Sequence, residues 1–561
     1  MAQARNQTTT MPATGDQRID GILSGTKWSM SSLGLSDTVS VADYPDYAAR
    51  SEPYTGYQPV TALQIEVLRF ELDEQVGGGF SVEGFTNLGI DYAHDDASAA
   101  IRVGQTAAAD TAFAYYPGSG LGGDVWFGTT QDYSNPQAGD YAWHTAIHEL
   151  GHALGLKHGQ DTAEYGALPS QYDSVEYSVM TYRTYVGDSS NVYGYEKFGA
   201  PQTWMISDIA ALQSMYGADY ASRSGDTVYA WRPDSGTTRI DGLEALTPGD
   251  NRIFMTVWDG GGKDTYDASA YATSVSLDLT PGGFSKLSAL QTADLGDGHD
   301  ARGNVFNALT FGGNQASLIE NAIGGSAGDV ILGNTAANVL QGRGGNDSLF
   351  GGDGRDHLVG GLGSDIVNGG LGFDFAEQTG SMGLYSRSWA DADTFQLVDA
   401  SGTVDRMVDV ERILFDDGIL AFDFEGQASD ETNAGIAYRL YRAAFDRTPD
   451  TTGLTFWTKW LDDDKTDPIN MAGRFIDSNE FRALYGSSDP DDGYFVTELY
   501  DNVLHRAPDA EGFAYWMAQL GGGTFGQADL LARFSDSDEN RDNVQHEIAD
   551  GITLSNEYYS F

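Results

Sequence analysis

The chain has 561 residues, with 31 basic and 82 acidic side chains, a net charge of −51 and no cysteine. A balance this acidic repels phosphate backbones and anionic lipid and favours cations as partners, which argues against nucleic acid as a ligand. Without cysteine no disulfide can stabilise the fold, so metals or packing must do so. The length predicts about three or four domains.

The first 220 residues mix helical and strand patterns. Residues 59–74 predict an amphipathic helix, because apolar side chains recur at helical spacing in Val60, Leu63, Val67 and Phe70. Residues 111–118 and 123–127 are short apolar runs next to glycine turns, which is typical of strands. From about residue 223 to residue 433 the helical pattern gives way to short strands and Gly/Asp turns.

The opening of the chain bears on localisation. Residues 1–15 are a candidate removable pro-segment, and they lack the apolar core of a secretory signal. If the protein is exported, it is expected to leave by a route that does not read the N-terminus. No stretch of the sequence approaches the roughly 20 apolar residues of a membrane span.

Clustered imidazoles are typical of metal sites, and four of the nine histidines lie within fifteen positions: His144, His148, His152 and His158. Three ligands spaced by four on an unbroken helix would spread over about 12 Å, too far for one ion with bonds near 2.1 Å. The helix must therefore end before the third ligand. Gly155 suits a left-handed turn at a helix end, which would bring back His158 as the third nitrogen.

This register gives the spelling His-Glu-x-x-His-x-x-Gly-x-x-His, with His148, His152 and His158 as ligands. Only here does an acid, Glu149, follow the first ligand, where it can take a proton from a water held by the metal. The alternative, histidines that merely cover a helix surface, leaves the five fixed positions unexplained. His144 is expected to lie beside the ligands or at the surface.

These residues resemble the zinc motif of the metzincin metalloproteases, in which a tight turn containing methionine follows the third histidine. The segment YSVMTY at 177–182 places Met180 in that turn. The resemblance implies that Met180 packs beneath zinc and is not a ligand. It also implies that Tyr182, as in the serralysin branch, ligates the resting zinc and then swings away to hydrogen-bond the developing oxyanion.

Three further segments resemble serralysins over most of the first 380 residues: IDGILSGTKW at 19–28, AFAYYPG at 112–118 and ISDIAALQSMYGA at 206–218. Two features depart from the family. The segment ELDEQVGGGF at 71–80 replaces a tryptophan-bearing helix end and is expected to change the shape of the cleft. Thr181 stands where the family more often has serine, which is expected to matter little.

The resemblance implies hydrolysis of peptide bonds. Zinc would activate the water and polarise the scissile carbonyl, with Glu149 as general base and then proton donor to the leaving amine. Tyr182 would donate to the oxyanion. A peptide would add as an extended strand along an edge formed by Ala112, Phe113, Ala114 and Tyr115. Main-chain bonds of this kind accept many sequences, so we expect a broad-specificity endopeptidase that acts on protein or peptide substrates.

Residues 324–377 form a repeat of six nine-residue units. The sixth position carries a carboxylate or amide in Asp329, Asn338, Asp347, Asp356, Asp365 and Asp374, and the eighth is apolar in Ile331, Leu340, Leu349, Leu358, Val367 and Ala376. Glycines permit tight turns, the polar side chain faces a cation and the apolar one faces the inside of a coil. The pattern resembles the calcium-binding nonapeptide of RTX proteins, a parallel β-roll; a flexible linker would need no apolar residue in register.

If successive units alternate sides, calcium ions would lie between units two apart. The expected pairs are Asp329 with Asp347, Asp347 with Asp365, Asp356 with Asp374, and Asn338 with Asp356 as the weakest site. Further calcium loops resemble those of the family: Asp259, Asp264 and Glu320 as side-chain ligands, and Arg223, Gly225, Thr227 and Gly261 as carbonyl donors. For each of these acids taken alone, the less favoured alternative is a solvated turn residue.

The last 130 residues are helical in pattern and contain a duplication at an offset of 59. Arg447, Pro449, Asp450, Gly453 and Trp457 recur as Arg506, Pro508, Asp509, Gly512 and Trp516. The segment resembles a helical repeat family of unknown function, number 4214, found in secreted bacterial proteins. Its apolar positions favour a core over a binding stripe; surface or glycan attachment is a conceivable role.

The sequence thus predicts a multidomain α+β protein. The expected parts are a zincin-like catalytic domain at 16–220, a calcium-binding parallel β-roll domain at 221–425 and an α-helical C-terminal domain at 426–561. One catalytic Zn²⁺, several structural Ca²⁺ ions, and extracellular release from a bacterium by the type I secretion apparatus follow from the resemblance. The alternative function is a calcium-dependent surface or adhesion protein with an incidental protease fold.

Overall fold

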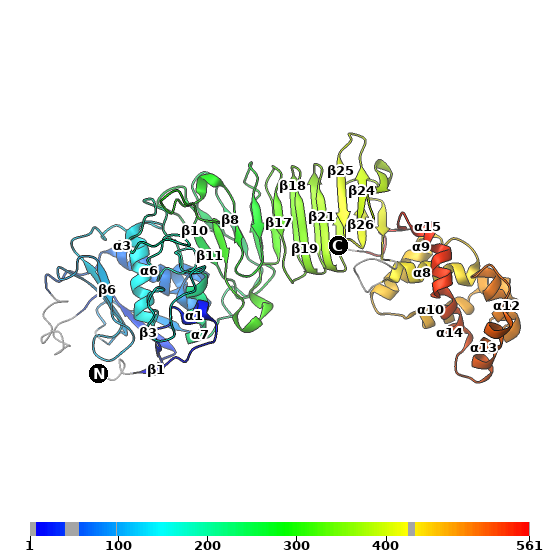
Figure 1. Ribbon diagram of the computed structural model, residues 1–561, viewed down its shortest axis with the longest axis horizontal. Helices are drawn as coiled ribbons and strands as arrows, with labels where there is room; N and C mark the ends of the chain where they lie inside the picture. Colours follow the sequence, from blue (N-terminus) through cyan, green and yellow to red (C-terminus); the bar gives the residue numbers. More distant parts are fainter. Residues whose placement is uncertain (1–6, 40–54, 97, 424–431, 560–561) are drawn as a thin grey trace. The chain divides into compact units, whose positions relative to one another are not determined.

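A computed structural model describes residues 7–39, 55–96, 98–423 and 432–559 (Figure 1). The chain divides into two compact units, Met1–Ala336 and Ala337–Phe561. The division falls inside the nonapeptide repeats. Each coil of a solenoid contacts only its neighbours, so a boundary between compact units can lie within a repeat array. The domain limits at residues 220 and 425 stay predictions.

The first unit contains a five-stranded sheet in the order β4-β3-β5-β7-β6, in which only β6 runs antiparallel to its neighbour. Its strands are β3 (Ser32–Ser36), β4 (Gly89–Tyr92), β5 (Ile101–Thr106), β6 (Ala112–Ala114) and β7 (Asp124–Gly128). The long helices are α3 (Ala62–Leu72), α6 (Tyr141–Leu154) and α7 (Ile206–Tyr216), with short turns at α1 (Gln17–Asp20), α4 (Glu74–Gly77) and α5 (Val82–Phe85). Helix α6 packs on β6 and β7, and α3 packs on α6.

Residues 8–10 are paired into this unit as strand β1, antiparallel to β2 (Thr26–Trp28). The Tyr165 hydroxyl also donates to the carbonyl of Met11 at 2.6 Å. The candidate pro-segment therefore contains residues that are bonded to the rest of the unit.

Helix α3 begins later than the sequence pattern predicts, and only part of its predicted apolar face is buried. Thr61 caps the helix in a reciprocal capping box with Gln64, which places the first helical residue at Ala62. Val67 and Phe70 are buried as expected, but Leu63 is 43% exposed. The buried residues of α3 are Gln64, Val67, Leu68, Phe70, Glu71 and Leu72.

Burial of Glu71 in this core lowers the stability of the fold when the carboxylate is ionised. It is fully buried, and among the described residues neither carboxylate oxygen has a hydrogen-bond partner. Burial raises the pKa of Glu71 well above its ordinary value. A raised folded-state pKa means that the proton stabilises the fold fully below the unfolded pKa of about 4.3, and that this stabilisation is lost as pH rises towards the folded value.

Glu71→Gln is therefore expected to raise the free energy of unfolding near pH 8, because the buried glutamine is neutral at every pH, whereas Glu71 must bind a proton to become neutral. The gain should fade as pH falls towards about 4. Denaturant unfolding at both pH values measures it, with Glu66→Gln on the exposed face of the same helix as control. Equal stability of Glu71→Gln and the parent chain at pH 8 would contradict this expectation.

The rest of the first unit consists of short strands: β8 (Val228–Trp231), β9 (Thr238–Ile240), β10 (Leu243–Leu246), β11 (Met255–Val257), β12 (Thr265–Asp267), β13 (Ser276–Asp278), β14 (Phe284–Ser285), β15 (Val305–Asn307), β16 (Asn321–Ile323) and β17 (Val330–Leu332). Among them β12 pairs in parallel with β8 and β16, and β13 pairs in parallel with β17. This is the start of a two-layered coil.

The second unit continues in two parallel layers. One contains β18 (Val339–Gly344), β20 (His357–Leu362), β22 (Phe375–Glu377) and β26 (Arg412–Phe415); the other contains β19 (Ser348–Gly354), β21 (Ile366–Gly372) and β25 (Val404–Val408). The eighth residues of the repeats are all buried at 0–1% exposure, as the pattern predicts. The register joins units two apart, as in Leu340 with Leu358 and Leu349 with Val367.

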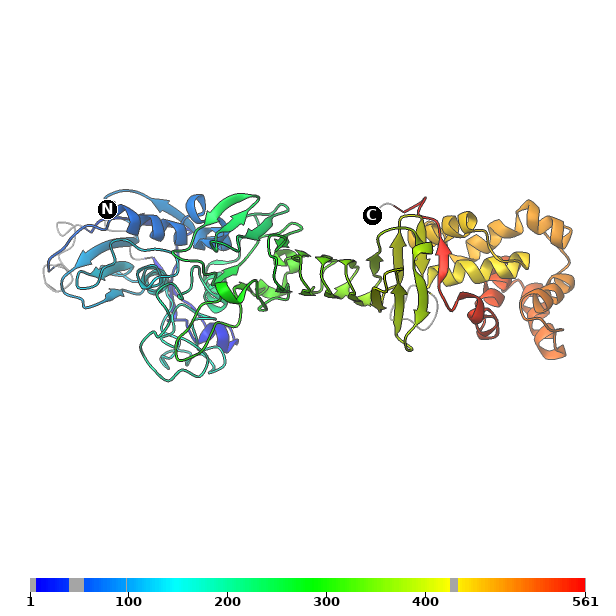
Figure 2. The ribbon, with the colours of Figure 1, turned by 90° about the horizontal axis from the view of Figure 1, so that it is seen from above.

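Antiparallel strands close this roll. They are β23 (Ser386–Trp389), β24 (Thr394–Val398), β27 (Gly418–Ala421) and β28 (Ile552–Leu554). Strand β28 comes from the end of the chain, where only helices were expected, and it lies beside β27 (Figure 2). The chain thus returns after its helices to cover a sheet edge.

The helices of the second unit repeat the sequence duplication. Helices α8 (Asn433–Phe445), α9 (Thr451–Asp462), α10 (Pro468–Ile476) and α11 (Asn479–Tyr485) are followed in the same order by α12 (Asp492–Asn502), α13 (Ala510–Gly521), α14 (Gln527–Ser535) and α15 (Asp538–Ile548). The ion pair Arg447–Glu480 has its counterpart in Arg506–Glu539. Helix α14 packs on α8 and α10. Among the described residues, none of the helices combines the length and the hydropathy that a membrane span requires.

Candidate metal centre

Helix α6 carries the first two histidines and ends where the third requires it to end. Asp140 caps its start by accepting from the main-chain N–H of Trp143 at 2.8 Å. Gly155 follows the helix in the left-handed region, with φ of 115°. The turn brings the Nε2 atom of His158 to 3.0 Å from that of His152 and 3.1 Å from that of His148. The histidine cluster predicted from spacing is thus assembled.

The other ring nitrogens of the helical pair are held by carbonyl oxygens. His148 Nδ1 lies 2.7 Å from the carbonyl of Val179, and His152 Nδ1 lies 2.8 Å from that of Leu156. These bonds place the proton on Nδ1 and leave the Nε2 lone pair for a cation. Burial lowers the pKa of both imidazoles, that of His152 to about 3, so both are neutral. Three neutral nitrogens that converge fit Zn²⁺.

Met180 and Tyr182 both lie beside the three histidines. Met180 is fully buried under α6, where a Cβ on Gly151 would overlap its Sδ atom. The Tyr182 hydroxyl lies 2.9 Å from His158 Nε2, at the point where the imidazoles converge. Burial raises the pKa of Tyr182 to about 12, so the phenol is protonated in the metal-free site.

Asp208, at the start of α7, fixes this turn from behind. Its buried carboxylate accepts from the Ser178 hydroxyl at 2.6 Å, the Val179 N–H at 2.8 Å and the Met205 N–H at 3.0 Å. The Val179 carbonyl is the one that orients His148. Asp208 therefore positions a ligand through one intervening residue, Val179, a role that the sequence pattern did not reveal.

Glu149 carries a buried carboxylate. Its Oε2 atom has no hydrogen-bond partner among the described residues. Burial raises its pKa to about 8. It lines a small cavity together with His148, Tyr182 and Ala112, so the carboxylate, the ligands and strand β6 share one space. A general base needs this closeness to the reacting water.

His144 lies outside the ligand set, as the register predicts, but it is not at the surface. It is 1% exposed, and its Nδ1 atom lies 2.9 Å from the Tyr195 hydroxyl. Burial lowers the pKa of His144 to about 4. The fourth histidine is thus a neutral core residue on the face of α6 that meets Tyr195 and Tyr193.

A cleft of about 740 Å³ adjoins the centre. Its lining includes Tyr141, Tyr182, Tyr193, Tyr195, Asp140 and Lys197. Strand β6, with Ala112, Phe113 and Ala114, is the edge strand of its sheet, and Tyr115 follows it with a main-chain bond to Asp124. The residues predicted to receive a peptide therefore lie on an edge beside the histidines. The tyrosines that follow the methionine turn were missed, because no periodic signal marks them.

The predicted calcium loops of the first unit come together. The hydroxyl of Tyr229 donates to Asp259 at 2.7 Å, and the main-chain N–H of Asp264 donates to Glu320 at 2.8 Å. Asp264 also accepts from the Thr227 N–H, and its Oδ2 atom has no partner among the described residues. Burial, and then the charge of Asp259, raise the pKa of Asp264 to about 8. Glu320, expected as a separate ligand, lies in the same cluster.

The loop residues Arg223, Gly225 and Gly261 lie in the same region. Arg223 has a positive φ of 49°, and its guanidinium donates to the Tyr229 hydroxyl at 3.0 Å. A Cβ on Gly262 would overlap the carbonyl of Gly225, and Gly261 donates its N–H to Asp259 at 3.1 Å. The chain therefore packs closely around the buried acids.

The family comparisons match three segments. Residues 81–173 match Matrixin, residues 218–375 match Peptidase M10 serralysin C terminal, and residues 422–482 and 472–544 match Domain of unknown function (DUF4214). Both metal-site regions lie within or directly after the first two matches.

Relatives of known name agree with these matches. Serralysin C of Dickeya chrysanthemi is 36% identical over 232 residues, 39% of this chain and 43% of the relative. Metallopeptidase AprA of Pseudomonas marginalis is 37% identical over 242 residues, 41% and 46% respectively. Serralysin G of Dickeya chrysanthemi is 30% identical over 311 residues, 53% and 57%. The chain thus spans about half the length of these relatives. The matches fall on the segments that carry the histidine cluster and the repeats, so residues 81–173 are similar to Matrixin and residues 218–375 to the C-terminal part of serralysins.

Proposed function

We propose that the protein is a secreted zinc-dependent endopeptidase of broad specificity that is stabilised by calcium. The observation that carries the proposal is the convergence of three neutral imidazoles beside the buried Glu149, whose Oε2 atom has no hydrogen-bond partner among the residues that the structure describes. A binding protein has no use for Glu149 in that place, because an isolated buried carboxylate costs stability. The complete set therefore favours catalysis over the adhesion alternative.

The proposed chemistry divides among a few side chains. Zn²⁺ held by His148, His152 and His158 would polarise the scissile carbonyl and lower the pKa of a bound water towards about 7. Glu149 takes the proton of the attacking water and passes it to the leaving amine. Tyr182 moves from its place beside His158 and donates to the developing oxyanion, a contact worth roughly 3 kcal/mol.

Substrate binding rests on strand β6. Its free edge can pair with an extended peptide through main-chain hydrogen bonds, which do not depend on side chains. The cleft beside Tyr182 is large enough for a bulky side chain. Both features support loose selectivity and protein substrates.

Calcium and export complete the proposal. Buried carboxylates line the roll in columns, and an oxygen-only set of this kind suits Ca²⁺. Calcium is scarce inside cells and plentiful outside, so ion binding would couple folding of the roll to release through a type I secretion apparatus. Attachment to a surface or glycan through the helical repeats remains a proposal without a specific site.

Metal analysis with a casein assay tests the enzyme. The purified chain, kept in excess calcium, is expected to hold one zinc ion and to hydrolyse casein. A zinc-selective chelator such as 1,10-phenanthroline should abolish hydrolysis, and added Zn²⁺ should restore it. Full hydrolysis by zinc-free protein would overturn the proposal.

A further inference from the structure

The repeat carboxylates of the second unit form two hydrogen-bonded columns. Each accepts from the main-chain N–H of the equivalent residue one coil earlier. The bonds join Asn338 to Asp356 at 2.7 Å, Asp347 to Asp365 at 2.9 Å and Asp356 to Asp374 at 2.8 Å. The three expected pairs within this unit are thus adjacent, each 18 residues apart.

Both columns continue past the last nonapeptide. The N–H of Asp365 donates to Asp405 at 3.0 Å, 40 residues on, and the N–H of Asp374 donates to Glu411 at 2.7 Å, 37 residues on. Asp405 is 4% exposed and Glu411 is 1% exposed. Neither belongs to a repeat unit. Both take the place of a repeat aspartate because β25 and β26 continue the two layers in parallel.

The two columns end differently. The second oxygen of Asp405 accepts from the side-chain amide of Gln378 at 2.9 Å, which gives that column a protein donor at its end. On the other face, Asp374 Oδ2 is buried and has no partner among the described residues. Within the part of the chain that the structure describes, the last aspartate of this second column therefore has a buried carboxylate oxygen without a partner, as Asp356 has in the interior of the column.

The positions of the carbonyl oxygens at the end of the second column also match those in its interior. A Cβ on Gly351 would meet both Asp356 Oδ2 and the carbonyl of Gly369, so these two oxygens lie around one point of the coil. One coil later, a Cβ on Gly369 would meet Asp374 Oδ2 and the carbonyl of Asp409 in the same way. Asp409 reaches this place with a positive φ of 47°, whereas its counterpart Gly369 does not have a positive φ.

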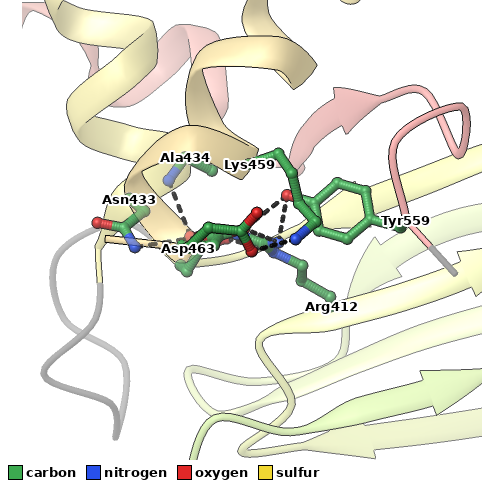
Figure 3. A network of polar contacts seen from close by, with 8 residues as sticks. Arg412, Asn433, Ala434, Lys459, Asp463 and Tyr559 are labelled. Atoms are coloured by element: carbon green, nitrogen blue, oxygen red, sulfur yellow. Dashed lines mark hydrogen bonds and ion pairs between the residues drawn. The ribbon is translucent and has the colours of Figure 1, made fainter. Parts of the chain in front are cut away.

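The cation that follows Glu411 in sequence is engaged elsewhere. Arg412 is fully buried and pairs with Asp423 at 3.0 Å and Asp462 at 2.7 Å, beside the Tyr559 hydroxyl (Figure 3). Successive residues of a strand face opposite sides. Glu411 thus faces the carboxylate column, while Arg412 faces the helices, and no arginine or lysine is hydrogen-bonded to Asp374 or Glu411 among the described residues.

We propose that a calcium ion binds beyond the repeats, held by the carboxylates of Asp374 and Glu411 and the carbonyl of Asp409. The proposal rests on calcium binding by the roll itself. The site joins the last repeat to β26, whose Arg412 anchors α8 and α9 through the Asp423 and Asp462 pairs. Calcium here orders the strand on which the helical repeats are mounted.

Calcium content of the full-length chain tests the site. After equilibrium dialysis, Glu411→Gln is expected to hold one calcium ion fewer than the parent chain, or to bind that ion at least about 10-fold more weakly. Asp416→Asn removes an exposed acid from the turn between β26 and β27 and should leave the content unchanged. If Glu411→Gln does not fold, Glu411→Asp keeps the charge and should weaken binding of the same ion.

The outcomes separate this site from the roll. If the parent chain binds no calcium, both the proposed calcium binding by the roll and the site proposed here are refuted. A parent chain that binds calcium, with the same number and affinity in Glu411→Gln or Glu411→Asp, overturns this site alone. Equal losses in Glu411→Gln and Asp416→Asn would also overturn it, because the effect would then be one of net charge.

Discussion

Glu149→Gln is expected to lose casein hydrolysis and to keep zinc. Glutamine has nearly the same shape but cannot take a proton, and general-base catalysis is worth about 10²- to 10⁴-fold in rate. The imidazoles converge through His158 and are oriented by the carbonyls of Val179 and Leu156, none of which bonds to Glu149. Metal content should therefore stay at the level of the parent chain.

The measurement pairs kcat on casein with zinc content of the same preparation. Glu164→Gln, an exposed acid of the same region, serves as the matched control and should change neither. Undiminished hydrolysis by a zinc-loaded Glu149→Gln protein would rule out the proposed role. A drop in both hydrolysis and zinc would mean that Glu149 holds the site together and does not act as the base.

The pKa of Glu149 is raised to about 8 in the metal-free site, and this links metal binding to general-base catalysis. Burial stabilises the protonated acid, so the metal-free site holds a proton near neutral pH. A bound cation favours the charged form of a neighbouring carboxylate and lowers its pKa. The base is therefore available chiefly when the metal is present.

Sequence alone could predict this centre because its parts are local. The three ligands span eleven residues, and their geometry follows from one helix and the left-handed Gly155. The roll was equally accessible, because each unit repeats its neighbour and the eighth position is apolar throughout. In both cases the residues that meet in space are also regularly spaced in the chain.

The parts that sequence did not reveal depend on contacts without a period. Asp208 reaches the methionine turn through a carboxylate that pattern cannot distinguish from any helix-start acid. Glu411 follows Asp374 by 37 residues, so a search at multiples of nine misses it. In α3 the pattern predicted the buried Val67 and Phe70 but not the exposure of Leu63, which lies in the first turn after the Thr61 cap.

Removal of calcium is expected to unfold the roll strands of the full-length chain. The carboxylates of Asp356, Asp365 and Asp374 are 0–1% exposed. Asp365 and Asp374 each have a carboxylate on both sides in their column, whereas Asp356 lies between Asn338 and Asp374. An ion at about 100 times its Kd stabilises a fold by about 2.7 kcal/mol per site, and several sites add. Without these ions the buried carboxylates lose the counterions that the calcium sites supply, and sheet structure should melt at a markedly lower temperature.

The sign of the pH effect follows from the same burial. It raises the pKa of Asp356 to about 7 and those of Asp365 and Asp374 to about 6. Folded-state values above the ordinary one mean that protons stabilise the calcium-free roll at acid pH. That stability is lost as pH rises from about 4 through 7. The calcium-free chain should therefore keep more sheet at pH 5 than at pH 8.

Circular dichroism at both pH values, with EGTA and with fixed free zinc, measures this difference. Added Ca²⁺ should restore the sheet at pH 8, whereas Mg²⁺ should not, because it demands a smaller octahedral shell. A chelated chain whose spectrum and melting temperature match the calcium-loaded one would mean that the hydrogen bonds between coils suffice. The carboxylates of the two columns would then be protonated instead of calcium-bound. The glycine turns would keep their conformation without calcium.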